Sequence, residues 1–231
     1  MPPPGLPRAN EAWLGPVADD MSRSNPVHER RIEYRGRIWS IARDRVTIGD
    51  RELERDVQLH PGAVAVIALD DDNRVLLIRQ YRHPVGMFLF EPPAGLLDVA
   101  GEDPLNTARR ELAEEAGVTA QQWRVLVDLF NSPGGSSEAI RIYLAQDLEA
   151  LPEGRPATGE AEEAHLPQAW VPLADAVELV LSGAVGSPTA VAGILAVQAA
   201  ISGAGDELRE ADAVWPARSW LESAARLPNV R

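Results

Sequence analysis

Three glutamates within five positions are the residues best suited to chemistry. Glu111, Glu114 and Glu115 lie in the run RRELAEEAG. On a helix, Glu111 and Glu115 lie about 40° apart around the axis and Glu114 lies about 60° to the other side of Glu111, so the three carboxylates share one face. Such like charges repel, and a bound cation would reverse that penalty. Hard oxygen ligands in a partly open cluster suit Mg²⁺ or Mn²⁺, which keep waters and bridge phosphates.

The surrounding residues predict a helix that holds this face in place. Asp103 suits the N-cap, Pro104 suits the first helical position, and Gly117 suits the left-handed position after the helix. An apolar stripe lies roughly 100° from the acidic face and can pack on a core; its residues are Leu105, Ala108, Leu112 and Ala116. The alternative is a solvated acidic helix face, which would leave the preceding glycine loop and the Arg-Glu pair unexplained.

Residues 95–118, GLLDVAGEDPLNTARRELAEEAGV, resemble the Nudix box, whose pattern is G-x5-E-x7-R-E-U-x-E-E-x-G-U with U aliphatic. Nine specified positions match in type: Gly95, Glu102, Arg110, Glu111, Leu112, Glu114, Glu115, Gly117 and Val118. One spacing departs, because six residues instead of five separate Gly95 from Glu102. An extra loop residue costs little, so it affects the placement of Glu102 and not the helical half.

The resemblance implies metal-dependent hydrolysis of a diphosphate linked to another group. Mg²⁺ is the expected cofactor, and Mn²⁺ can substitute. The implied metal ligands are the backbone carbonyl of Ala94 and the carboxylates of Glu111, Glu114 and Glu115. Arg110 is a catalytic candidate that orients the glutamates through a salt bridge, and Glu102 steadies the loop.

Features outside the box resemble the ADP-ribose pyrophosphatase branch of the family. Pro133, in Ser-Pro-Gly-Gly, lies 15 residues beyond Val118, and Arg82 ends the run Gln-Tyr-Arg. The resemblance implies that ADP-ribose is cleaved to AMP and ribose 5-phosphate. It also implies four substrate-binding candidates: Arg82, Leu96, Gly134 and Glu138. The alternatives are that Ser-Pro-Gly-Gly is merely a turn between two strands and that Arg82 forms a surface salt bridge.

A general base is expected on a loop well after the box, by the same resemblance. Residues 159–165, GEAEEAH, precede a predicted strand and fit that loop. Glu162 is the first candidate and Glu163 the second, since either could be the base and the other a metal ligand. An acidic loop without a catalytic role is the alternative.

Composition limits the class of protein. The net charge is −13, with 35 acidic and 22 basic residues, which argues against non-specific binding to nucleic acid or a membrane surface. All the basic residues are Arg, so a lysine nucleophile is ruled out, and the absence of cysteine rules out disulfides and thiolate metal sites. No apolar run is long enough to span a bilayer, and the Pro-rich, charged start does not resemble a signal peptide. A cytoplasmic protein is expected.

The chain divides into four stretches. Residues 1–26 read as a disordered tail, 27–60 as an N-terminal β region of about three strands, 61–205 as the catalytic domain, and 206–231 as a tail that packs on the body. Three strands are too few to bury their own core. The ADP-ribose branch has a similar region that exchanges between protomers, so a homodimer is expected.

The catalytic domain is expected to have an α/β fold, with a mixed β-sheet sandwiched between α-helices (α/β/α), as in the Nudix fold. The predicted strands are GAVAVIALD, VLLIRQYR and FLFEPPAG before the helix, then WRVLVDLF, AIRIYLAQDL and AWVPL. Helices are predicted near 173–182 and 187–202.

Two other functions remain open. One is another Nudix activity, on an oxidised nucleoside triphosphate or a different nucleotide sugar. The other is a non-catalytic module that senses a nucleotide, although such a module would be expected to lose the glutamates that this chain keeps.

Overall fold

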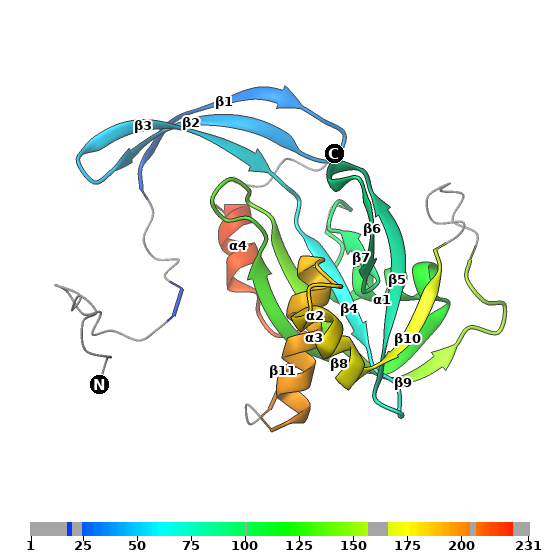
Figure 1. Cartoon of the computed structure of the whole chain (residues 1–231). Helices are drawn as coiled ribbons and strands as arrows, with labels where there is room; N and C mark the ends of the chain where they lie inside the picture. The colour runs from blue at the N-terminus through cyan, green and yellow to red at the C-terminus, as the bar shows by residue number, and fades with distance from the viewer. Residues whose placement is uncertain (1–17, 20–24, 100, 157–165, 204–206, 224–231) are drawn as a thin grey trace.

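A five-stranded mixed sheet forms the centre of the protein, seen here in a computed structural model that describes residues 18–19, 25–99, 101–156, 166–203 and 207–223 (Figure 1). Its strand order is β11-β8-β9-β4-β7. The strands span Ala63–Ala68 (β4), Ala94–Leu96 (β7), Val118–Phe130 (β8), Ala139–Ala150 (β9) and Arg209–Glu210 (β11). β4 runs parallel to β9 and antiparallel to β7, and β7 is the edge strand beside β4.

Alternate residues of β4 enter two separate hydrophobic cores, as expected for a strand buried on both faces. Val64 and Val66 pack with the helices α1 (Pro104–Ala116) and α4 (Pro216–Ser223). Ala65 and Ile67 pack with α2 (Leu173–Leu181) and α3 (Pro188–Ile201) on the other face. The predicted α/β/α arrangement is therefore confirmed, with α2 and α3 in front of the sheet in Figure 1.

Helix α3 approaches the sheet closely at Gly193. A Cβ atom on Gly193 would lie 2.6 Å from Cδ1 of Ile67, so only glycine allows the helix to pack at this distance. In the described part of the chain, the helices are too short or too polar to cross a membrane. The cytoplasmic location stays a prediction.

A second sheet has the order β10-β5-β6 and consists of Gln168–Pro172 (β10), Arg74–Arg82 (β5) and Met87–Glu91 (β6). A short 3-10 turn, η1 (His83–Val85), joins β5 to β6. The prediction of one continuous strand over FLFEPPAG was wrong, because β6 and β7 lie in different sheets. Pro92 and Pro93 separate them, and proline has no N–H to donate to a strand partner.

The strand after α1 also begins earlier than predicted. β8 starts at Val118, directly after the glycine that ends the helix, instead of near Trp123. Its first residues pair with the end of β9, with Val118 opposite Ala150. The box helix therefore leads directly into the central sheet.

Residues 27–60 form a third, antiparallel sheet of Val27–Arg35 (β1), Ser40–Ile48 (β2) and Arg51–Leu59 (β3). It extends away from the central sheet at the top of Figure 1. At the other end of the chain, Trp215 is buried in the core beside α1, and Trp220 packs against it. The C-terminal helix α4 is thus part of the layer that covers one face of the central sheet.

Candidate active site

Helix α1 has the ends that the sequence predicts. The carboxylate of Asp103 accepts a hydrogen bond from the backbone N–H of Leu105 at 2.8 Å, and Gly117 has a φ of 66°. These are an N-cap and a left-handed C-terminal residue. Ala108, Leu112 and Ala116 are buried. The helix is therefore fixed at both ends and along one side.

Two of the three glutamates lie buried between α1 and the edge strand β7. Glu111 is 8% exposed and Glu115 is 4% exposed. The backbone N–H of Ala94 donates to a carboxylate oxygen of Glu115 at 2.9 Å. A Cβ atom on Gly95 would lie 2.1 Å from Oε1 of Glu111. The box therefore begins with glycine because any side chain there would occupy the place of the Glu111 carboxylate.

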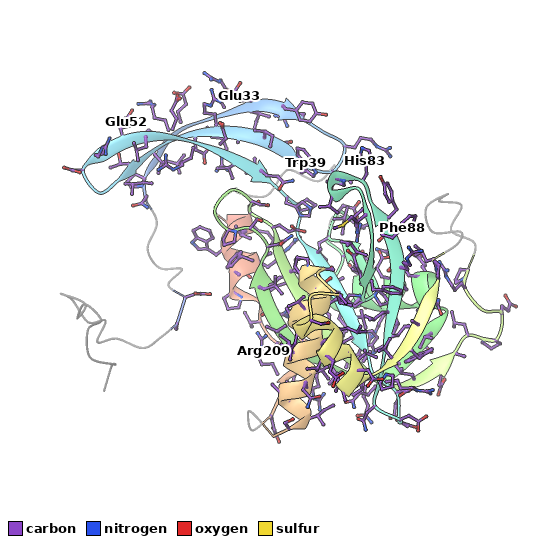
Figure 2. All side chains as sticks on the ribbon, viewed as in Figure 1. Glu33, Trp39, Glu52, His83, Phe88 and Arg209 are labelled. Atoms are coloured by element: carbon purple, nitrogen blue, oxygen red, sulfur yellow. The ribbon has the colours of Figure 1, made fainter. Side chains whose placement is uncertain are left out.

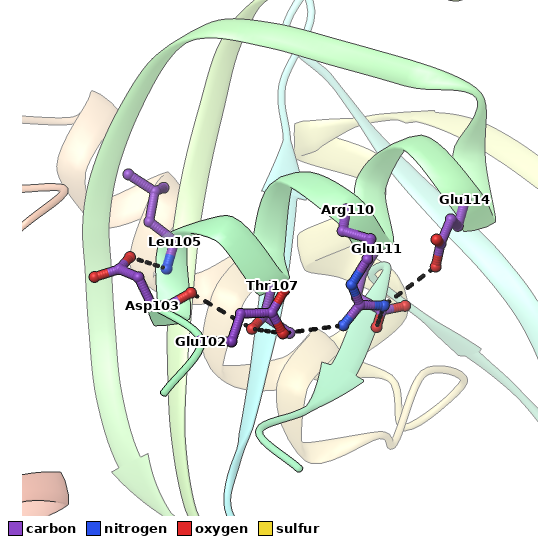
Figure 3. A network of polar contacts seen from close by, with 7 residues as sticks. All are labelled: Glu102, Asp103, Leu105, Thr107, Arg110, Glu111 and Glu114. Atoms are coloured by element: carbon purple, nitrogen blue, oxygen red, sulfur yellow. Dashed lines mark hydrogen bonds and ion pairs between the residues drawn. The ribbon is translucent and has the colours of Figure 1, made fainter. Parts of the chain in front are cut away.

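Arg110 joins the acidic groups of the box in one network (Figure 3). Its guanidinium donates to Glu111 at 2.7 Å, to Glu114 at 3.2 Å and to Glu102 at 3.4 Å. The hydroxyl of Thr107 donates to the same oxygen of Glu102 at 2.9 Å. Burial lowers the pKa of Arg110, but the hydrogen bond to Glu102 and the charges of Glu111 and Glu102 outweigh it and raise the pKa. Glu102 therefore reaches Arg110 despite the extra residue in the loop.

The chemistry of these donors fits a hard divalent cation. Two buried carboxylates lie against β7: Glu115 accepts the N–H of Ala94, and Glu111 fills the space beside Gly95. The N–H and C=O of one residue in an extended strand point to the same side, so the carbonyl of Ala94 lies on the Glu115 side. Within the ranges the structure describes, no three acidic or histidine side chains are grouped closely enough to hold an ion. In this structure, Glu111 and Glu114 form ion pairs with Arg110.

Residues on both sides of 157–165 bind the C-terminal end of α1. Arg155 donates to the carbonyl of Glu114 at 3.2 Å, and Gln168 donates to the carbonyls of Glu115 and Ala116 at 3.1 Å. Arg155 also donates to the carbonyl of Leu166 at 3.3 Å. Carbonyls at the end of a helix have no partner within it, so these side chains satisfy them. The sequence did not reveal this clamp, because no local pattern links the three segments.

The candidate bases Glu162 and Glu163 lie outside the described residues. The clamp nevertheless places residues 155 and 168, which flank them, at the end of the helix that carries Glu114 and Glu115.

Leu96 and Glu138 lie near the same end of the central sheet. Ile140 of β9, Ala63 of β4 and Leu96 of β7 lie side by side across three strands, which places the outer two about 10 Å apart. Glu138 precedes β9 and accepts a hydrogen bond from the side chain of Asn131 at 2.7 Å. The sheet therefore brings the start of the box close to the loop that follows Pro133.

Gly134 lines a pocket of about 290 Å³. The walls come from β1 and β3, from the end of β8 and the loop that follows it, and from α4. They include Arg55, Val57, Phe130 and Trp220. The N-terminal sheet, the Ser-Pro-Gly-Gly loop and the C-terminal helix thus meet at one place.

Arg82 forms the salt bridge that the sequence left open as the alternative to substrate contact. Its guanidinium lies 2.5 Å from a carboxylate oxygen of Glu91, which is 5% exposed. The side chain of Arg82 is itself 43% exposed, and a guanidinium has five N–H donors. Donors therefore remain for a ligand, and the substrate contact of Arg82 stays a prediction.

Comparison with known proteins agrees with this geometry. The NUDIX domain family matches residues 59–190. An ADP-ribose pyrophosphatase of Mycobacterium tuberculosis (strain ATCC 25618 / H37Rv) is 44% identical over 194 residues, which cover 84% of this chain and 92% of that protein. An ADP-ribose pyrophosphatase of Bacillus subtilis (strain 168) is 38% identical over 130 residues, 56% of this chain and 68% of that protein.

A solved structure described as "Crystal structure of ADP compounds hydrolase" superposes with a TM-score of 0.66. The match covers 80% of this chain and 98% of the solved chain, at 24% sequence identity. At this identity the likeness concerns the fold alone. The family match spans more than half of the chain and includes the acidic helix, the glycine that admits Glu111 and the edge strand beside them. This chain therefore belongs to the Nudix family.

Proposed function

We propose that this protein hydrolyses the diphosphate of ADP-ribose to AMP and ribose 5-phosphate and that Mg²⁺ is its metal, with Mn²⁺ able to substitute. The observation that carries the chemistry is the pair of buried carboxylates, Glu111 and Glu115, held against Gly95 and Ala94 of β7. The names of the two bacterial relatives support ADP-ribose as the substrate.

The side chains of the site have distinct roles in this proposal. A divalent cation, when bound, would neutralise the diphosphate and acidify a water. Glu111, Glu114, Glu115 and the Ala94 carbonyl would hold that cation, and Arg110 keeps Glu111 and Glu114 oriented through its ion pairs. Arg82 would contact a diphosphate or ribose oxygen.

A separate group must accept the proton of the attacking water. We assign this role to Glu162, with Glu163 as the second choice. The clamp supports the assignment, because Arg155 and Gln168 hold both flanks of this segment at the end of the metal-binding helix.

The test is AMP release from ADP-ribose with and without Mg²⁺, beside a panel of nucleoside triphosphates and nucleotide sugars. We expect AMP only with the metal, and a higher kcat/KM for ADP-ribose than for the other compounds. Equal or faster turnover of a nucleoside triphosphate or another nucleotide sugar would reject ADP-ribose as the main substrate. Binding without turnover of any compound would instead indicate a sensing module.

We also propose that the protein is a homodimer joined through residues 27–60. On one face of this sheet, Val27, Val46 and Leu53 form an apolar row across the three strands. Val27 is exposed, and so is Ile48, which lies two residues after Val46 on the same face of β2. Charged side chains such as Glu33 and Glu52 cover the other face (Figure 2). Three strands do not bury a core alone, so a second copy is the natural cover for the apolar face.

Light scattering on the full chain tests the dimer. We expect a mass twice the 25.0 kDa of one chain across micromolar concentrations. The mass of a single chain throughout that range would contradict it.

A further inference from the structure

His60 is a buried histidine with no role in the chemistry above. It lies between β3 and β4, and its side chain is 9% exposed. The backbone N–H of Gly62 donates to its Nδ1 at 3.1 Å, so Nε2 carries the proton in the neutral ring. Nε2 lies 3.7 Å from a carboxylate oxygen of Glu138. Burial lowers the pKa of His60 and the charge of Glu138 opposes this, with burial dominating.

On one side, His60 and its neighbours hold the loop that carries Ser-Pro-Gly-Gly. The other carboxylate oxygen of Glu138 accepts from Asn131 at 2.7 Å, at the start of that loop. The backbone N–H of His60 donates to the hydroxyl of Ser137 at 3.0 Å. Gln58 adds two backbone hydrogen bonds to Gly135 and Ser137, at 2.8 and 2.9 Å. Residues 58–60 therefore pair with the loop much as another strand would.

On the other side, the same histidine reaches the start of the Nudix box. Gly62, whose N–H binds the ring of His60, accepts a hydrogen bond through its carbonyl from the N–H of Leu97 at 3.1 Å. Gly62 has a φ of +90°, and a Cβ atom there would lie 3.0 Å from the carbonyl oxygen of Ala139, so a larger residue is excluded. Leu97 is two residues after Gly95, the glycine that admits Glu111.

We propose that His60 is a positioning residue that fixes the Ser-Pro-Gly-Gly loop relative to the start of the Nudix box, and that Glu138 acts through His60 and Asn131. The inference rests on the proposed hydrolysis of ADP-ribose. The start of the box lies on β7 and the loop leads into β9, and these strands are not neighbours, because β4 lies between them. His60 lies just before β4, so it contacts the end of the loop directly and the box through Gly62. The network sets where a substrate bound to that loop lies relative to the metal-binding carboxylates.

Two isosteres separate the two contacts of the ring. His60→Asn keeps an acceptor at the position of Nδ1 and loses the N–H that faces Glu138. His60→Gln keeps an amide N–H at the position of Nε2. Nε2 lies 3.7 Å from the Glu138 carboxylate, longer than a direct hydrogen bond, so this link is an electrostatic contact between the ring N–H and a negative charge. We expect His60→Asn and Glu138→Gln each to raise KM for ADP-ribose by up to about tenfold. We expect kcat to stay within about twofold. His60→Gln keeps an N–H toward Glu138 but loses the acceptor for the N–H of Gly62, so it should also raise KM, by less than His60→Asn, because a contact between neutral groups is weaker than one to a charge.

The two substitutions should also be coupled. A double variant of His60→Asn and Glu138→Gln is expected to have the KM of either single variant, because each substitution removes the same contact between His60 and Glu138. His83→Asn is the matched control, since His83 is exposed on η1 (Figure 2), and it should leave KM unchanged. Additive effects, an unchanged KM in His60→Asn, or equal losses in kcat for Asn and Gln would overturn the proposal.

Amide hydrogen exchange gives a readout that needs no substrate. In His60→Asn, residues 132–137 should exchange faster than in the wild-type protein, while α2 and α3 exchange as before. Unchanged exchange in the loop would also overturn the proposal. If the wild-type protein did not cleave ADP-ribose, the proposed function would fail, and the exchange experiment would still decide whether His60 holds the loop.

Discussion

Glu115→Gln is expected to lower kcat for ADP-ribose on the order of 10³-fold while the protein stays folded. The substitution is nearly isosteric, and the amide oxygen can still accept the N–H of Ala94 that Glu115 accepts at 2.9 Å. What is lost is a negative charge in a buried position. A metal site contributes several kcal/mol to transition-state stabilisation, and each 1.36 kcal/mol is a factor of ten in rate. The measurement is AMP release under saturating ADP-ribose and Mg²⁺.

Two further measurements separate loss of metal binding from loss of structure. Glu178→Gln is the control, because Glu178 is an exposed glutamate on the helix α2, and it should keep wild-type kcat and Tm. Mg²⁺ should raise the Tm of the wild-type protein and of Glu178→Gln, and raise that of Glu115→Gln much less. Wild-type turnover in Glu115→Gln would contradict the assignment of the acidic face to the metal.

The acidic helix could be predicted almost completely because its determinants are local. Asp103 and Gly117 act within one turn of the residues they cap, and the apolar stripe follows from helical geometry. The role of Gly95 is different. The sequence pattern predicted a glycine at this position, but only the structure shows why. The carboxylate of Glu111, 16 residues later, occupies the space that a Cβ atom on Gly95 would take.

The contacts that position the site were not predictable, because they join residues far apart in the chain. Gln168 binds carbonyls of α1 more than 50 positions earlier, and His60 contacts Ser137 and Glu138 across 77 and 78 positions. No periodicity or spacing in one sequence marks such pairs. The break between β6 and β7 could have been foreseen, since Pro92 and Pro93 are a direct signal that a strand ends.

The central sheet brings the substrate candidate Leu96, inside the box, near Glu138, which precedes β9. Leu96 and Ile140 are 44 positions apart in sequence, yet each lies next to Ala63. The position of β4 between β9 and β7 would therefore allow the box and the Ser-Pro-Gly-Gly loop to act on one molecule. In the proposed function, the box would supply the carboxylates, and the loop would supply contacts to the rest of the substrate.

Glu162→Gln is expected to lower kcat for ADP-ribose by about 10²–10⁴-fold with little change in KM, the range for loss of a general base. The glutamine cannot accept the proton of the attacking water, whereas the proposed ground-state contacts of Arg82 and of the box carboxylates would be unaffected. The loss should shrink as pH rises, because hydroxide then replaces the missing base. Steady-state kinetics of AMP release between pH 6 and about 10 would measure both effects.

Glu163→Gln and Glu160→Gln are the comparisons, since both make the same chemical change in the same acidic segment. If Glu163→Gln shows the large kcat loss and its pH dependence, the base lies one residue along the chain. Glu160→Gln should keep wild-type kinetics, because Glu160 is not a candidate for the base. If the segment acted only through its overall charge, all three substitutions would lower kcat equally. Near-wild-type kcat in both Glu162→Gln and Glu163→Gln would remove the base from this segment, although Arg155 and Gln168 hold its flanks at the metal-binding helix.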